Sequence, residues 1–117
     1  MRTRPKQLGT AFETRTVRRA QDKGLVAERI AEGGAQDLGD VRVYTDPEWV
    51  LECKDRQQLN VHQALEKAQL KSGTRRTAVV WRRMVRKKGN TNRTQQGPIV
   101  AVVELDVFLE LLAEREA

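Results

Sequence analysis

The 117-residue chain contains one cysteine and one histidine, and this scarcity excludes several chemistries. A single cysteine, Cys53, cannot form an internal disulfide, and a chain without disulfides fits a reducing compartment. One cysteine and one histidine cannot supply the ligands of a zinc finger or of a zinc-dependent deaminase. The single histidine also argues against an HNH-type nuclease. We therefore expect a cytoplasmic protein, associated with the nucleoid or, for a viral protein, present in the host cytoplasm.

Aromatic residues make up only 4% of the chain, which argues against binding of single-stranded nucleic acid by serial base stacking. No run of apolar residues approaches the length of a membrane span, so we expect no membrane partner. The first thirteen residues include Arg and Lys but no apolar stretch, so we also expect no secretory signal. Hydrophobic residues amount to 38%, which is typical of one soluble domain with a small core.

Basic residues are abundant and unevenly distributed. The formal net charge is +6, and residues 67–103 contain ten Lys or Arg and no acid. The acids gather instead over 28–55 and 104–116. A basic surface beside an acidic cluster is typical of a protein that holds a polyphosphate and places a metal ion against it. We expect nucleic acid as the partner; the alternative is a basic protein that is merely soluble.

The pattern of apolar residues, caps and glycines predicts one α/β domain over residues 1–117. A mobile basic arm is expected over 1–8 and a basic loop over 86–98. The predicted elements are, in order, a helix from Thr10 to Gly24, strands over 25–30, 41–44 and 49–54, a helix over 61–70 capped by Asn60, strands over 77–85 and 99–105, and a helix capped by Asp106. The near-continuous apolar strand over 99–105 is expected at the centre of the sheet.

Residues 49–56, WVLECKDR, place two opposite charges in an apolar strand. Side chains alternate along a strand, so Glu52 and Lys54 share one face while Cys53 points to the other. Two interpretations are open. The pair is either a cross-sheet ion pair on a solvated face or the metal ligand and lysine of a nuclease.

Asp40 is the second acid of interest, because the turn over 45–48 places it opposite about position 53 and hence beside Glu52. Two carboxylates that meet in this way repel unless a cation lies between them, and hard oxygen ligands favour Mg²⁺ or Mn²⁺. Lys54 would orient a water or neutralise charge on a phosphate. Asp40 also fits an ordinary turn aspartate. Asp37 is the alternative ligand.

Glu13 is the third acid and has two possible roles. In GTAFE, Thr10 and Glu13 have the spacing of a capping box, in which each side chain satisfies a backbone donor of the other. Glu13 would alternatively join Asp40 and Glu52 at a metal site. The two roles can coexist.

Asp40 followed after eleven residues by Glu52-Cys53-Lys54 resembles the PD-(D/E)xK motif of restriction-endonuclease-like nucleases. Gly39 stands where the motif has proline. The upstream GTAFE resembles the Gly-Ser/Thr-x-x-Glu opening of archaeal-type Holliday-junction resolvases.

This resemblance covers about residues 8–112 and implies an αβββαβ core with a mixed central sheet flanked by helices. It implies that Glu13, Asp40, Glu52 and the backbone carbonyl of Cys53 bind Mg²⁺ or Mn²⁺ and that Lys54 is the catalytic lysine. It also implies a homodimer acting on branched double-stranded DNA. The Cys53 side chain itself is expected to fill the core.

Further residues are candidates for contacts with substrate. Gln63, on the helix after the motif, is a possible extra site residue, whereas His62 beside it is expected either to face solvent or to be a simple packing residue. Arg56 is either a phosphate contact or the partner of an acid such as Asp55. Trp81 is expected in the core. The residues expected to contact DNA are Thr10, Arg15, Arg56, Arg82, Arg83, Lys87 and Lys88, with Arg86 and Arg93 in the same basic cluster.

The sequence thus favours a metal-dependent, structure-selective endodeoxyribonuclease, specifically a Holliday-junction resolvase. One alternative keeps the fold and changes the substrate, as in a flap, repair or restriction nuclease. The other is a non-catalytic, basic DNA-binding module in which Glu52 and Lys54 are structural.

Overall fold

The computed structural model describes residues 5–30, 39–86, 89 and 92–116, with the side chains of 5–9 left aside. It contains ten elements over these residues. They are α1 (Pro5–Asp22), β1 (Ala27–Arg29), β2 (Val41–Val43), β3 (Trp49–Asp55), α2 (Val61–Ser72), β4 (Arg76–Arg82), β5 (Met84–Arg86), β6 (Arg93–Gln95), β7 (Val100–Val102) and α3 (Leu105–Glu116).

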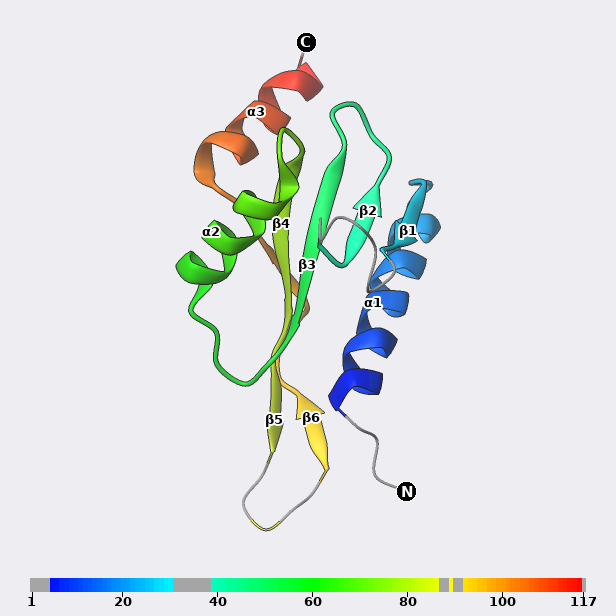
Figure 1. Ribbon diagram of the computed structural model, residues 1–117, viewed down its shortest axis with the longest axis vertical. Helices are drawn as coiled ribbons and strands as arrows, with labels where there is room; N and C mark the ends of the chain where they lie inside the picture. The colour runs from blue at the N-terminus through cyan, green and yellow to red at the C-terminus, as the bar shows by residue number, and fades with distance from the viewer. Residues whose placement is uncertain (1–4, 31–38, 87–88, 90–91, 117) are drawn as a thin grey trace.

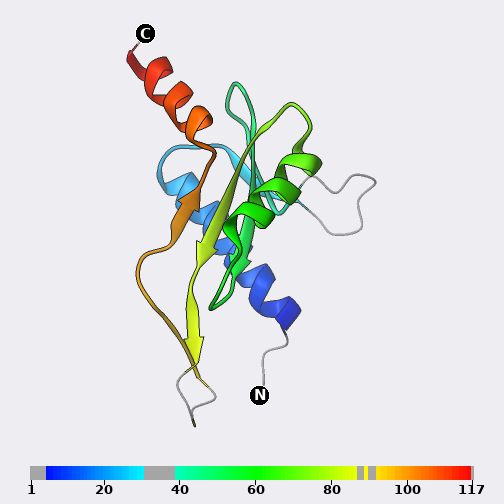
Figure 2. The same ribbon diagram turned by 90° about the vertical axis from the view of Figure 1, so that its left-hand side faces the viewer.

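A five-stranded mixed sheet with the order β1-β2-β3-β4-β7 forms the centre of the molecule (Figure 1). Only β3 and β4 are parallel, and α2 is the crossover between them. Helices α1 and α2 lie on opposite sides of the sheet (Figure 2). The α/β class and the predicted order of one helix, three strands, one helix and a further strand are therefore confirmed.

Each face of the sheet has its own small apolar core. On one face, Val17 and Ala20 of α1 pack against the buried Val41 and Val43 of β2. On the other face, the buried alanines of α2 pack against Val79 of β4. Helix α2 begins as predicted, because the Asn60 side chain accepts a hydrogen bond from the backbone N–H of Gln63.

The start of α1 corrects two predictions. The helix begins at Pro5, so residues 5–8 belong to α1 and not to a mobile arm. Proline suits the first helical position, where its missing N–H leaves no bond unmade. Thr10 lies inside the helix as a result, and its carbonyl accepts a hydrogen bond from the Thr14 hydroxyl. The capping-box interpretation of Thr10 and Glu13 is therefore wrong.

The predicted strand over 77–85 and the predicted basic loop over 86–98 are also corrected. The strand divides at Arg83, and β5 and β6 pair as a separate antiparallel hairpin in which Met84 lies opposite Gln95. This β5–β6 arm, defined as the two strands Met84–Arg86 and Arg93–Gln95, extends beyond the end of the main sheet (Figures 1 and 2). The polarity of residues 93–95 concealed the strand, because Thr94 and Gln95 are exposed and no apolar alternation marks the segment.

The C-terminal elements differ from the prediction in position. β7 has three residues and lies at the edge of the sheet, not at its centre, and Val100 is 41% exposed. Helix α3 begins at Leu105, so Asp106 lies in the first turn and is not the N-cap. No residue of α3 is buried, and Figure 2 shows the helix projecting away from the sheet.

Among the described residues, no helix is long and apolar enough to cross a membrane.

Candidate metal and phosphate site at the end of the β2–β3 hairpin

The β2–β3 hairpin brings Asp40 beside Glu52, as predicted. Val41 pairs with Leu51, and the Asp40 N–H donates to the Leu51 carbonyl at 3.1 Å. The Cys53 N–H donates to Asp40 Oδ2 at 2.8 Å. The Asp40 carboxylate is thus fixed against the middle of β3, one residue away from the expected register.

Gly39 allows this close approach of the two strands. Its φ is +134°, and a Cβ atom built there would lie 2.4 Å from Val50 Cγ1 and 3.2 Å from Glu52 Oε2. Proline, whose φ is fixed near −65°, cannot adopt this conformation. The presence of glycine instead of proline at this position therefore has a local steric cause.

Glu52 is buried at 7% exposure and lies between two lysines. Its Oε1 is 3.9 Å from Lys54 Nζ and 3.5 Å from Lys71 Nζ. Its Oε2 is buried and has no hydrogen-bond partner among the described residues. Burial raises the pKa of Glu52 and the charge of Asp40 adds to this, whereas the two lysines lower it. A carboxylate oxygen without a partner in such a position is the kind of group that a cation satisfies.

Glu13 of α1 lies close to the acids of the β2–β3 hairpin. Its Oε2 accepts from Arg29 Nε at 2.7 Å, and it lies near enough to Asp40 to raise the pKa of that carboxyl. Burial raises the pKa of Asp40 to about 6; the Cys53 N–H opposes this shift, and the charge of Glu13 adds to it. The hairpin and α1 therefore bring together all four predicted residues, namely Glu13, Asp40, Glu52 and Lys54.

Two of the three acids predicted as ligands, Asp40 and Glu52, are placed so that they could bind a divalent cation. Asp40 and Glu52 are neighbouring carboxylates with raised pKa values, and one Glu52 oxygen lacks a partner among the described residues. Glu13 is engaged by Arg29 and would have to exchange that partner. Within the described part of the chain, no three Asp, Glu, His or Cys side chains already form a metal-binding group. Asp37, the alternative ligand, lies outside the described residues.

Cys53 fills the core, as expected. Its thiol lies 3.7 Å from the Thr16 hydroxyl, and burial raises its pKa to about 12. A thiol with so high a pKa is not a nucleophile at neutral pH. The proposed role of the Cys53 carbonyl as a metal ligand remains a prediction.

The sequence reasoning missed Lys71 and Arg29, which contact the acids of the site. Lys71 follows the buried Ala64 and Ala68 of α2 with near-helical spacing, which could have placed it on the face that meets β3. Arg29 gave no comparable signal, because its contact with Glu13 depends on how α1 packs over β1.

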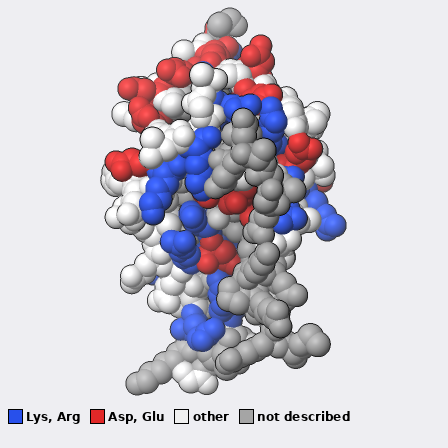
Figure 3. Space-filling model, viewed as in Figure 1, with Lys and Arg blue, Asp and Glu red and all other residues white. Residues whose placement is uncertain are grey.

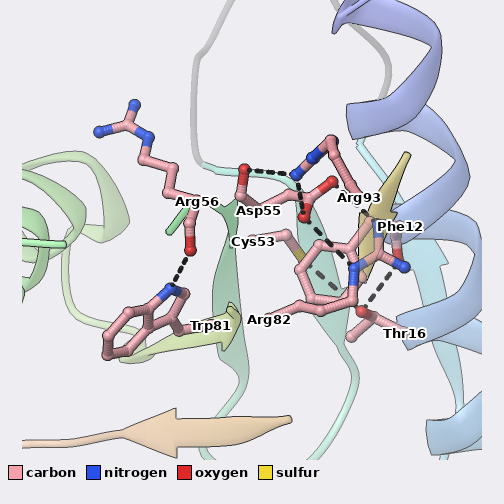
Figure 4. Close-up of polar contacts among 8 residues, drawn as sticks. All are labelled: Phe12, Thr16, Cys53, Asp55, Arg56, Trp81, Arg82 and Arg93. Atoms are coloured by element: carbon pink, nitrogen blue, oxygen red, sulfur yellow. Dashed lines mark hydrogen bonds and ion pairs between the residues drawn. The ribbon is translucent and has the colours of Figure 1, made fainter. Parts of the chain in front are cut away.

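The predicted DNA contacts divide into two groups. Arg15, Arg56, Arg83 and Arg86 are exposed, whereas Lys87 and Lys88 lie outside the described residues. Arg82 is buried at 9% exposure and Arg93 is half-buried, and both bind the carboxylate of Asp55 (Figure 4). Arg82 is therefore unavailable to a phosphate. Asp55 pairs with these two arginines and not with Arg56, whose side chain points away from it.

The remaining candidates occupy simpler positions. Thr10 is half-buried within α1, and Gln63 and His62 are both exposed. The exposure of His62 agrees with the solvent-facing alternative. Gln63 caps α2 through its backbone, and Lys71 is the α2 residue that contacts Glu52. Trp81 is half-buried and donates from Nε1 to the Arg56 carbonyl at 2.8 Å, consistent with a packing role.

Charges of both signs gather on the face shown in Figure 3. Acidic side chains near the middle of this face have Lys and Arg side chains on several sides. Such an arrangement can hold a cation against the acids and attract a phosphate backbone around it.

No protein-family model matches the chain, and no curated protein matches it either.

Proposed function

We propose that the protein is a metal-dependent, structure-selective endodeoxyribonuclease, specifically a Holliday-junction resolvase that nicks four-way DNA junctions. The observation that carries the proposal is the convergence of Asp40, Glu52 and Lys54 at one end of the β2–β3 hairpin, with Glu13 beside them. The resemblance of these residues to the PD-(D/E)xK motif supports the same activity.

Asp40 and Glu52 would hold the cation, with support from Glu13. A divalent cation bound there would act as a Lewis acid that activates water and neutralises charge on the scissile phosphate. The raised pKa values of the two acids fit this role, because a bound cation removes the repulsion between them.

Lys54 would act on the phosphate side of the reaction. Its ammonium group lies 3.9 Å from Glu52 Oε1, on the strand face that carries the acid. From this position it would orient the attacking water and offset negative charge on the phosphate. In-line attack at phosphorus would leave a 5′-phosphate, as the family resemblance implies.

A second copy of the chain would complete the enzyme, since two symmetric strands of a junction must be cut. The exposed leucines and Phe108 of α3 form a stripe on the helix that follows the edge strand β7 in the chain. The stripe consists of Leu105, Phe108, Leu109 and Leu112, with spacings of three and four residues. An open strand edge beside an apolar helix is a surface suited to self-association.

The test is cleavage of a labelled four-way junction, a flap and a linear duplex, each with Mg²⁺ or with EDTA. We expect paired symmetric nicks in the junction, lost with EDTA and reduced by at least a hundredfold in Glu52→Gln. The matched control is Glu66→Gln, which changes an exposed glutamate of α2. Equal cutting of flaps would keep the nuclease and discard the resolvase assignment.

A non-catalytic DNA-binding module is the second candidate, and one observation favours it. Glu52 is neutralised by Lys54 and Lys71, and Glu13 by Arg29, so the charges of the site are partly satisfied without a cation. Binding of all three DNAs without any cutting would establish this alternative.

A further inference from the structure

The residue that follows Lys54 in β3 lies in a second charged cluster. The Asp55 side chain is 9% exposed, and it forms ion pairs with two arginines that belong to different sheets (Figure 4). Arg82 of β4 donates from Nη2 to Oδ2 at 2.9 Å. Arg93 of β6 donates from Nη2 to Oδ1 at 2.8 Å.

Arg82 alone would satisfy Asp55. Its Nε also lies 3.4 Å from Oδ1, so it reaches both carboxylate oxygens. Its guanidinium lies over the ring of Phe12, 4.4 Å from the centroid, which ties the pair to α1. A buried carboxylate needs one such partner for neutrality, and the second arginine leaves a net positive charge in the cluster. The contact of Arg93 therefore requires a reason other than charge balance.

Arg93 connects the β5–β6 arm to the strand that carries the candidate site. Its Nη2 also donates to the Asp55 carbonyl at 3.3 Å, so Arg93 binds both the side chain and the backbone of Asp55. The base of the arm is held by two further contacts. The Gln96 N–H donates to the Arg83 carbonyl at 2.9 Å, and Arg83 Nε donates to the Gln57 carbonyl at 3.0 Å.

We propose that the Asp55–Arg93 contact is a positioning contact that holds the β5–β6 arm at a fixed angle to the Glu52–Lys54 strand and thereby sets a preference for branched over linear DNA. This inference rests on the proposed function, because it assumes that DNA occupies both the arm and the site.

The physical basis is the spacing of two binding surfaces on one rigid frame. Arg86 is exposed on the arm and Arg83 is exposed at its base, and the arm extends beyond the sheet (Figure 1). A duplex bound by these arginines would reach Asp40 and Glu52 only if the direction of its axis matched the direction in which the arm is held. Rigid placement lets one DNA geometry engage both surfaces and excludes others, whereas a loosened arm accepts more geometries.

The experiment measures dissociation constants for a four-way junction and a linear duplex of the same total length, in EDTA at fixed salt. The junction preference is the dissociation constant for the duplex divided by that for the junction. For Arg93→Gln we expect this ratio to fall about three- to tenfold. Arg86→Gln is the matched control on the same arm, and it should weaken both constants alike. Arg93→Lys, which keeps the charge but loses the forked geometry, should restore the ratio only in part.

Asp55→Asn is the more discriminating variant, because it removes a negative charge and so separates an electrostatic effect from a positioning effect. Simple electrostatics predicts tighter binding to every DNA, whereas a positioning contact predicts a lower ratio. The double variant Asp55→Asn/Arg93→Gln should match Asp55→Asn alone if Arg93 acts through Asp55, because Asp55→Asn also weakens the Arg82 pair. Hydrogen exchange should report faster exchange of the arm amides in Arg93→Gln, which keeps the Arg82–Asp55 pair and hence the fold.

An unchanged ratio in Arg93→Gln, or no preference for junctions in the wild type, would overturn the inference. These outcomes are separate from a failure of the proposed function, because binding in EDTA requires no cleavage. A protein that selects junctions through Arg93 but never cuts DNA would refute the nuclease and keep the positioning contact.

Discussion

At the scale of single residues, the candidate site concentrates unfavourable interactions that the fold tolerates. Asp40 lies beside Glu13 and Glu52, and burial penalises its charged form. Gly39 adopts a positive φ so that the strands can approach one another. Costs of this kind cluster at functional sites, where the surrounding structure imposes them.

The pKa of Asp40 predicts a pH-dependent cost to stability. Because its folded pKa is about 6 and its ordinary value is 3.8, its stabilising contribution is complete below pH 3.8 and is lost as the pH rises through 6. Without metal, Asp40→Asn should therefore be more stable than the wild type by about 1–2 kcal/mol at pH 8, with the difference shrinking toward pH 4. Urea unfolding in EDTA at both pH values measures it.

Addition of Mg²⁺ provides the control for Asp40. The ion should stabilise the wild type at pH 8 and leave Asp40→Asn nearly unchanged. A difference between the two proteins that stays constant from pH 4 to pH 8 would show that Asp40 is not buried beside Glu13 as described.

Gly39 makes a second prediction at this scale. Gly39→Ala introduces a Cβ that would lie 2.4 Å from Val50 Cγ1 at a strained φ, so it should destabilise the fold by about 2–4 kcal/mol. Gly24 has φ +84° with nothing within 4 Å of its Cβ position, so Gly24→Ala should cost only about 1 kcal/mol. Equal losses in urea unfolding would contradict the close contact at Gly39.

At the scale of elements, the sequence predicted what local pattern and charge determine. The β2–β3 hairpin was predicted with a one-residue error in register because its turn and alternation are local signals. The arm and the edge position of β7 were missed because they depend on which strands pair, and pairing depends on tertiary contacts. The same limit applied to Arg82, whose burial is decided by the packing of α1 through Phe12.

At the scale of elements, the apolar stripe of α3 predicts self-association through this helix. Leu112→Glu places a charge in its apolar stripe and should weaken the proposed self-association by about tenfold or more, which sedimentation equilibrium would record as a shift from dimer to monomer. Leu70, which is 87% exposed on α2, provides the matched control. Leu70→Glu should leave the proposed self-association unchanged. A monomeric wild type at high protein concentration would remove α3 as an interface.

At the scale of the whole molecule, charge is separated along the chain. The net charge is +6, and α3 is an acidic helix in which Glu110 and Glu114 bind Arg76. The basic β5–β6 arm lies at the opposite end of the molecule from α3 (Figure 1). This separation predicts that DNA approaches from the side of the arm.

Salt dependence of DNA binding measures that approach. Arg83→Gln/Arg86→Gln removes two expected phosphate contacts and should lower the slope of log affinity against log salt by about 2. Lys23→Gln/Lys67→Gln removes the same charge from exposed sites elsewhere and should change the slope much less. Equal changes in the two variants would show that net charge, not the arm, governs binding.

The position of the arm in the chain has a consequence for how the molecule can be altered. Trp81 and Val100 are paired neighbours in the main sheet, yet all of the arm lies between them in sequence. The arm is thus an insertion into a β4–β7 hairpin, and replacing it with a short turn would leave every strand of the five-stranded sheet in its place. Under the proposed function, binding selectivity and the chemical centre would occupy separable modules, and exchange of this one insertion would change the substrate range.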